Sequence, residues 1–178
     1  AKRYQVLSSP GSGNQALSAR TIHEVTQNSY DQVVVLWTGI NRLDVPISEE
    51  LNKTYPENKP GTWIARCNIG SMVWFHSGGI LGSGTTDDSL TPEFLKKFFR
   101  NQYMGTTSGS KYLSELTLLS IVSTQAVLEK LKIPYQMGFI YDALRPFDNE
   151  VFEHCHGIIC KDTPLYNAVD WTKFTRYE

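Results

Sequence analysis

The residue types best suited to chemistry in this sequence lie in two polar turns. The later turn reads Gly39-Ile40-Asn41-Arg42 and follows the apolar run VVVLWT. A side-chain amide just after a strand can donate a hydrogen bond to a developing oxyanion, and one such donor lowers a barrier by roughly 3 kcal/mol. Gly39 lacks a side chain, so other groups can approach its backbone closely. Asn is also common in turns without a chemical role, and this turn alone does not decide between the two interpretations.

The earlier turn reads Gly11-Ser12-Gly13-Asn14 and comes directly before a predicted helix. Backbone N–H groups at the start of a helix attract negative charge, so the Gly13 amide is a second candidate oxyanion donor. The glycine spacing does not match the dinucleotide-binding pattern, and no lysine follows as in a P-loop. The alternative is a glycine-rich turn that only reverses the chain.

The elements around these turns predict how the turns are positioned. Residues 4–9 (YQVLSS) are a strand candidate. A helix is predicted from a cap at Ser12 or Asn14 to about Gln27. Residues 31–37 predict a buried strand, because their continuous apolar character suits a parallel strand covered on both faces. Ligands of open parallel sheets bind beyond the C-terminal ends of the strands, so both turns should face one crevice.

The second half of the chain adds an insertion, a long helix and another strand. Residues 43–110 are too many for a plain loop, and TWIARC and SMVWFH within them predict a hairpin joined by Asn68-Ile69-Gly70. We expect this insertion to act as a lid or to contact a neighbouring subunit. Residues 111–132 predict a largely buried helix capped by Ser110, and residues 135–141 predict the next strand. The apolar residues assigned to the buried helix are Leu113, Leu116, Leu119, Val122, Ala126, Val127 and Leu131.

Length, composition and charge narrow the class of protein. The chain has 178 residues, enough for one domain with a sizeable core, and a net charge of −1 without any basic block. We therefore expect neither a nucleic-acid partner nor a membrane-surface partner. No apolar run approaches the ~20 residues that span a bilayer. No secretory signal precedes the first predicted strand, so a cytoplasmic or virion-associated location is expected.

Cysteine, histidine and aromatic residues give weaker signals. The three cysteines (Cys67, Cys155 and Cys160) cannot all pair within one chain, which favours free thiols. His154 and His156 flank Cys155, but their spacing to Cys160 matches no zinc motif, so we expect no metal and no cofactor. Aromatic side chains at this density usually form a core, although some could stack a sugar ring. The candidates for stacking are Trp37, Trp63, Trp74 and Phe75.

Taken together, the two turns resemble blocks II and III of the SGNH (GDSL-type) hydrolase family. Block III of that family usually reads Gly-x-Asn-Asp, whereas this chain has Arg42 at the last position. Block II supplies an oxyanion glycine, which aligns best with Gly13. The Trp37-Thr38-Gly39 form is similar to that of small SGNH-like proteins from phages and environmental bacteria. The resemblance covers residues 4–44 well, and residues 111–141 fit the family's order of helix and strand without adding a motif.

Two further blocks of the family are missing from the chain. Block I, a Gly-Asp-Ser with the nucleophilic Ser, has no counterpart, and neither has block V, an Asp-x-x-His with the base. A serine hydroxyl without a base within hydrogen-bond reach is a poor nucleophile. We therefore expect a chain that is truncated at both ends and inactive as it stands. If it is active, the first pairs to test are Ser77 with His76 and Ser12 with His154.

The resemblance implies one domain over residues 1–178, with three α/β/α layers, a mostly parallel flavodoxin-like sheet and the insertion at about 43–110. It implies an ester hydrolase, for example a carbohydrate deacetylase, acting on a small ester or an acylated carbohydrate. Asn41 and Gly13 would be the oxyanion donors. The residues that would contact substrate are Gly39, Arg42, Ser12 and Asn14. The alternative is a non-catalytic binding or structural module, phage- or glycan-associated, on the same fold; a homo-oligomer is compatible with both hypotheses.

Overall fold

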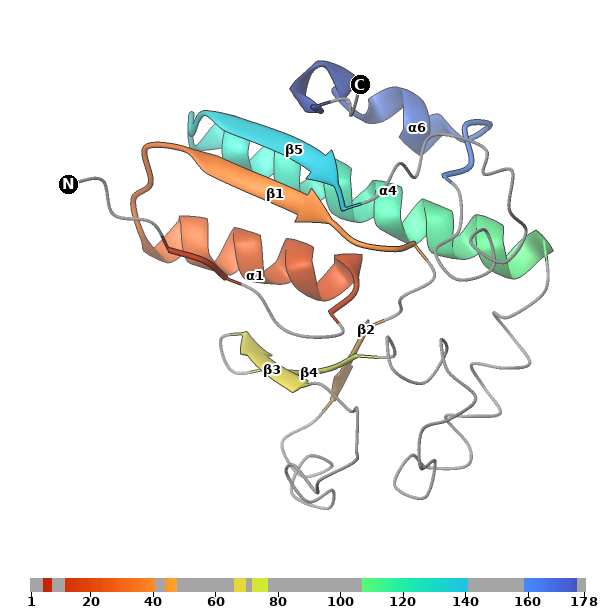
Figure 1. Ribbon diagram of the computed structural model, residues 1–178, viewed down its shortest axis with the longest axis horizontal. Coiled ribbons are helices and arrows are strands. Elements are labelled where there is room, and N and C mark those ends of the chain that lie inside the picture. Colours follow the sequence, from red (N-terminus) through yellow and green to blue (C-terminus); the bar gives the residue numbers. More distant parts are fainter. Residues whose placement is uncertain are drawn as a thin grey trace.

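The computed structural model describes residues 5–7, 12–40, 44–47, 66–69, 72–76, 107–140 and 159–175. In chain order these residues form α1 (Asn14–Gln27), β1 (Val33–Trp37), β2 (Asp44–Ile47), β3 (Arg66–Ile69), β4 (Met72–His76), α4 (Thr107–Lys130), β5 (Tyr135–Phe139), α6 (Pro164–Ala168) and the 3-10 helix η3 (Trp171–Lys173) (Figure 1). Several predictions lie outside the described residues, namely those on Asn41, Arg42, Trp63, Ser77 and the run His154-Cys155-His156.

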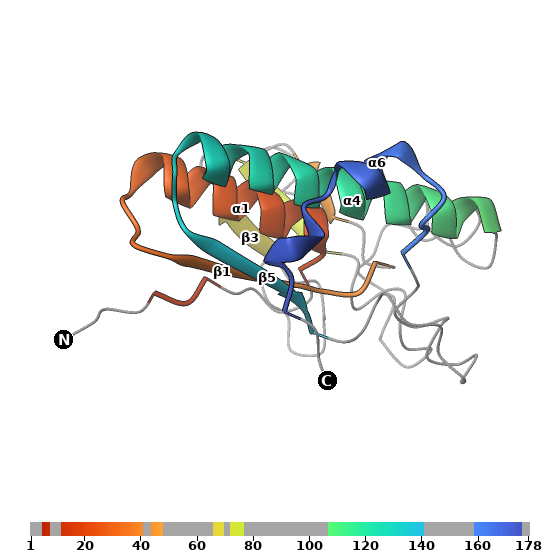
Figure 2. The ribbon, with the colours of Figure 1, turned by 90° about the horizontal axis from the view of Figure 1, so that it is seen from above.

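Strands β1 and β5 form a two-stranded parallel sheet, in which Val33 lies opposite Tyr135 and Trp37 opposite Phe139. Helices α1 and α4 lie side by side on one face of this sheet (Figures 1 and 2). Each strand follows its helix along the chain, so the described part has the α/β character that the sequence predicts. The predicted parallel pairing of the strand after α1 is confirmed.

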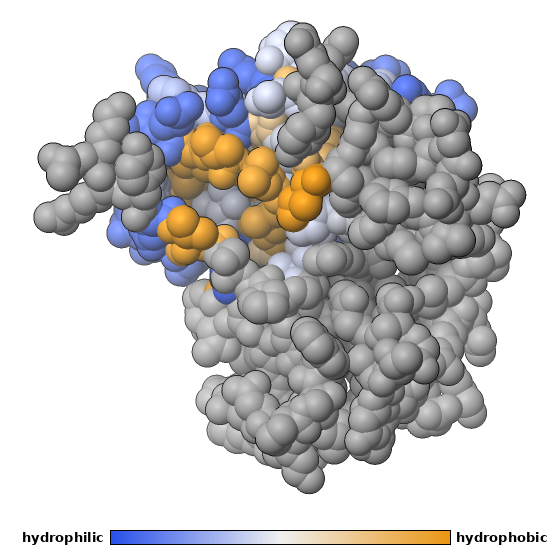
Figure 3. Space-filling view, in the orientation of Figure 1, coloured by the Kyte–Doolittle hydropathy of each residue, from blue (hydrophilic) through white to orange (hydrophobic). Residues whose placement is uncertain are grey.

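The two faces of β1 differ, whereas the sequence predicts a strand covered on both faces. Val35 and Trp37 point toward the helices and are buried, whereas Val34 is 62% exposed and Leu36 51% exposed. Figure 3 shows apolar surface gathered over β1 and β5 on this outer face. Pairing with β5 uses the N–H of Val33 and the C=O of Trp37. Backbone N–H and C=O groups of successive residues point to opposite edges of a strand. The N–H and C=O groups of Val34 and Leu36 therefore point to the edge of β1 away from β5.

The N-terminal elements agree with the prediction in the helix but not in the strand or the cap. Helix α1 ends at Gln27, as expected, but residues 5–7 form no strand. The N-cap of α1 is Gly13 rather than Ser12 or Asn14, and it has no side chain with which to cap the helix. Asn14 is instead the first helical residue. Another part of the chain must therefore satisfy the first amides of α1.

Helix α4 is longer at its start than predicted and buries a different set of residues. It begins at Thr107, so Ser110 lies inside the helix and does not cap it. It ends at Lys130, and Lys132 follows with a φ of 56° in a left-handed turn. The prediction of a largely buried helix rests on seven apolar residues, of which only Leu113 is fully buried, while Leu119, Ala126 and Leu131 are exposed. Among the described helices, none combines the length and apolar character that a membrane span requires.

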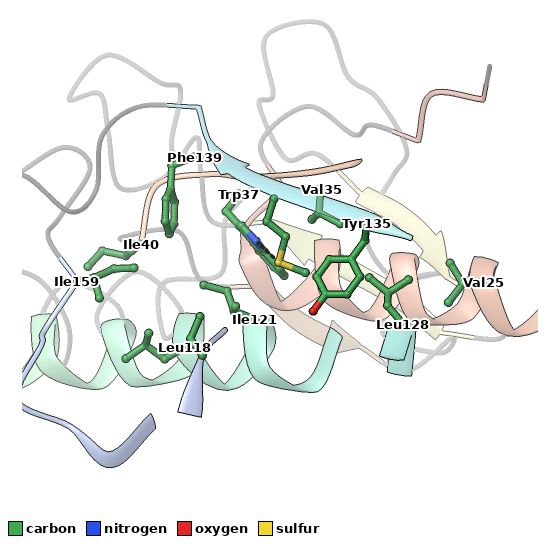
Figure 4. Packing of buried hydrophobic residues seen from close by; sticks show 12 residues of the cluster. Val25, Val35, Trp37, Ile40, Leu118, Ile121, Leu128, Tyr135, Phe139 and Ile159 are labelled. Carbon is green, nitrogen blue, oxygen red and sulfur yellow. Dashed lines mark hydrogen bonds between the residues drawn. The ribbon is translucent and has the colours of Figure 1, made fainter. Parts of the chain in front are cut away.

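The hydrophobic core lies between the sheet and α4. Trp37 on β1 and Met137 on β5 are fully enclosed, and the Trp37 Nε1–H donates to Met137 Sδ at 3.4 Å. Leu118, Ile121 and Leu128 project from α4 toward these strands (Figure 4). The interpretation of Trp37 as a core residue is confirmed, and this side chain is not available to stack a sugar.

A row of buried polar residues joins α1 to α4. Ser18 on α1 donates to the Ser120 carbonyl at 3.1 Å and lies 2.9 Å from the Thr124 hydroxyl. Ser120 and Thr124 also donate to carbonyls one turn earlier in α4. Small hydroxyl side chains let the two helices approach closely, and each hydroxyl finds its partner inside the helix pair. We call Asn14, Ser18, Thr117, Ser120 and Thr124 the polar seam.

The predicted insertion contains a small antiparallel sheet in the order β2-β4-β3. The expected hairpin is confirmed as β3 and β4, with Ile69 paired to Met72. Asn68 and Ile69, which were expected in the turn, belong to β3. Ile69 is buried and packs with Ala16 of α1, so this sheet contacts the N-terminal half of α1.

The C-terminal segment, which the sequence left ambiguous, is fastened to α4 and β5. The Gln125 side chain of α4 donates to the Asp170 carbonyl at 2.9 Å and accepts from the Asp170 N–H at 3.0 Å. The Thr175 N–H donates to the Met137 carbonyl at 2.8 Å, on the edge of β5 away from β1. The Thr172 side chain donates to the Asp170 carboxylate and lowers the pKa of that carboxyl.

Candidate functional site

The start of α1 and the C-terminal end of β1 lie against each other, and Asn14 joins them. Its side-chain oxygen accepts from the Thr38 N–H at 2.8 Å, and its amide nitrogen donates to the Thr38 carbonyl at 3.3 Å. The second hydrogen of the same amide donates to the Thr117 hydroxyl of α4 at 3.1 Å. Asn14 is 0% exposed. Both amide hydrogens and the side-chain oxygen therefore bond within the protein, to Thr38 and to Thr117 of α4.

A second link supports this arrangement. The Thr38 hydroxyl donates to the Ser12 carbonyl at 3.3 Å, with the Gly39 carbonyl at 3.4 Å. Thr38, Gly39 and Ile40 are all buried where the chain leaves β1. Ser12 and Asn14 of the earlier turn are thus held against Thr38, the residue just before the later turn. Asn41 and Arg42 lie outside the described residues, so their share in an oxyanion site stays a prediction.

A carboxylate occupies the N-terminus of α1. Asp44, the first residue of β2, is 5% exposed, and its Oδ1 accepts from the Gly13 N–H at 2.8 Å. Its Oδ2 accepts from the Ala16 N–H, also at 2.8 Å. In a capping box, the side chains of two helix residues satisfy the amides at the N-cap and three residues later. Here the single distant carboxylate of Asp44 does both, which explains how a helix that begins at a glycine is capped.

The Asp44 contact determines what the Gly13 amide can do. The sequence predicts Gly13 N–H as a donor to a substrate oxyanion, and the described structure shows it donating to Asp44 Oδ1. The positive end of α1 is thereby matched by a negative charge from within the chain. An oxyanion that used the Gly13 amide would share it with Asp44 or displace one oxygen of Asp44.

Gln15 is the neighbour of this carboxylate. Its side-chain oxygen accepts from the Asp44 N–H at 3.3 Å. Its Nε2 is buried and, within the described part of the chain, has no hydrogen-bond partner. A buried donor without a partner is uncommon in folded proteins. The junction of α1 with β2 therefore holds one amide donor that an acceptor atom could still satisfy.

The remaining candidates for chemistry are placed as follows. Cys160 is a free, partly exposed thiol whose backbone N–H donates to the Ser114 hydroxyl at 2.7 Å. The described residues contain no group of three or more histidine, cysteine or acidic side chains that could hold a metal ion. Cys155 and its flanking histidines lie outside these residues, so the expectation of no zinc site stays a prediction.

Sequence reasoning missed Asp44, Thr38 and Thr117 as residues of this site. Thr38 takes part through its N–H, its carbonyl and its hydroxyl, and Thr117 through its hydroxyl. Nothing in the spacing of these two residues distinguishes them from other threonines. Asp44 lies about thirty residues beyond the N-terminus of α1 that it caps, so its role has no signal in the sequence near that helix.

Comparison with known proteins found no matching family model, no matching curated protein and no matching solved structure.

Proposed function

We propose that the chain is an SGNH-like ester hydrolase domain whose site forms where the turns after β1 and before α1 meet. The observation that supports this most directly is the double hydrogen bond between Asn14 and Thr38, which brings Gly13 and Gly39 to the same end of β1. In the proposed site, the Gly13 N–H and the Asn41 side chain donate to the oxyanion. Oxyanion donors must converge at about 3 Å on one atom, and a rigid junction between the two turns serves that requirement.

The proposed fold of the domain has three α/β/α layers with a mostly parallel sheet of the flavodoxin-like SGNH type. The β1–β5 pair with α1 and α4 on one face provides two of the layers. The third layer would cover the outer face, where Val34 and Leu36 are exposed. Ser12, Gly39 and Arg42 would line the substrate, and Asn14 would hold the turns in position.

The proposed substrate is a small ester or an acylated carbohydrate, which the resemblance to the hydrolase family suggests. A nucleophile and a histidine base are not identified in the chain, so the domain as it stands would bind this class of substrate without efficient turnover. The location proposed is cytoplasmic or virion-associated.

A second candidate function, a non-catalytic binding or structural module, is favoured by the Asp44 contact. Asp44 satisfies both the Gly13 and the Ala16 amides, and Asn14 spends its whole side chain inside the protein. Polar groups that satisfy each other in this way build a rigid junction without any ligand. A module of this kind would keep the fold and bind through another surface.

Amide-resolved NMR separates the two functions. The labelled chain would be titrated with an acetylated xylo-oligosaccharide and, as the matched control, with the same oligosaccharide after deacetylation. The hydrolase proposal expects shifts at the Gly13 amide and the Asn41 side chain with the acetylated sugar only, and loss of the Gly13 shift in Asn41→Ala. Shifts that are equal for both sugars, or unaffected by Asn41→Ala, would refute an oxyanion site and favour the binding module.

A further inference from the structure

We draw no further inference here: the strongest candidate, the edge of β1 that pairs with no described strand, with the exposed apolar side chains of Val34 and Leu36 on the outer face of the sheet, carries none because nothing in the structure shows which strand, subunit or partner covers it.

Discussion

The side-chain amide of Asn14 makes two hydrogen bonds to the backbone of Thr38: it accepts from the Thr38 N–H at 2.8 Å and donates to the Thr38 carbonyl at 3.3 Å. In a sheet, the backbone of a neighbouring strand satisfies the N–H and the carbonyl of a residue, whereas here a side chain does so. These two hydrogen bonds attach the start of α1 to the residue that follows β1. The position of the candidate site therefore depends on one buried asparagine.

Replacing Asn14 with Ala should destabilise the protein by about 3 kcal/mol. The change leaves the Thr38 N–H, the Thr38 carbonyl and the Thr117 hydroxyl without their partner, and each buried orphan costs roughly 1–3 kcal/mol. Urea unfolding followed by circular dichroism measures the change. Asn167→Ala, at an exposed position of α6, is the matched control and should stay within about 0.5 kcal/mol of wild type. An equal effect of both variants would contradict the assigned role.

Replacing Asp44 with Ala should uncap α1 and lower the free energy of unfolding by about 2 kcal/mol. The carboxylate is the acceptor for two amides, Gly13 and Ala16, so hydrogen exchange at these two amides should accelerate first. Asp44→Asn keeps one acceptor oxygen and should lose less. The exposed Asp31 provides the control through Asp31→Ala. Unchanged exchange at Gly13 and Ala16 in Asp44→Ala would show that another group caps the helix.

The exposed side of β1 should tolerate polar substitution and the buried side should not. Leu36→Lys places a charge on an open strand edge, a common protection against edge-to-edge association, and should reduce concentration-dependent self-association in sedimentation velocity. Its stability should change by less than about 1 kcal/mol. Val35→Ala, one residue away on the buried face, should cost about 2 kcal/mol and leave self-association unchanged. The reverse ranking would mean that the faces of β1 are assigned incorrectly.

Tyr135 should make the stability sensitive to alkaline pH. Burial, followed by the hydrogen bond that its hydroxyl donates to Glu129 at 2.9 Å, raises the pKa of Tyr135 above the ordinary value of about 10. A raised pKa in the folded state gives stability that is present below the unfolded pKa and is lost as the pH rises above it. In Tyr135→Phe, tyrosinate absorbance should lose one late-titrating tyrosine relative to wild type, and the alkaline stability profile should be flatter. Identical titration curves for the variant and the wild type would refute this.

The chain should not hydrolyse p-nitrophenyl acetate far above background. An oxyanion pair and binding alone leave residual catalysis on the order of 10³-fold over water, well below a complete site. Robust turnover that Asn41→Ala abolishes would overturn this expectation and place a nucleophile within the chain. The pairs Ser77 with His76 and Ser12 with His154 would then be replaced first.

The elements that were predicted correctly are those in which neighbouring residues all indicate the same structure. The glycine turn and the apolar run after it identified α1, the end of that helix at Gln27 and a strand that pairs in parallel. The hairpin was recovered as β3 and β4, although its turn was placed about two residues too early. In each of these cases the information lies within a few residues of the element itself.

The predictions that failed concern tertiary contacts, because they depend on which elements pack against each other. The prediction that α4 is largely buried rests on its apolar residues, but Ser114, Thr117, Ser120 and Thr124 are buried in it and Leu119 is not. Hydroxyl groups count as polar in a periodicity analysis, although a neighbouring helix can satisfy them. The capping of α1 by Asp44 joins residues about thirty positions apart, so no local pattern contains it. The side chains on the outer face of β1 are apolar, yet they are exposed in the described structure. Composition alone does not predict this exposure.

The polar seam also restricts movement of the site. Two helices that meet through leucines can slide along each other by small steps, since one methyl contact replaces another. Ser18 and Asn14 have specific partners on α4, and sliding by even one residue would break those hydrogen bonds together. Helices α1 and α4 therefore act as one mechanical unit that carries the Gly13 turn at its end.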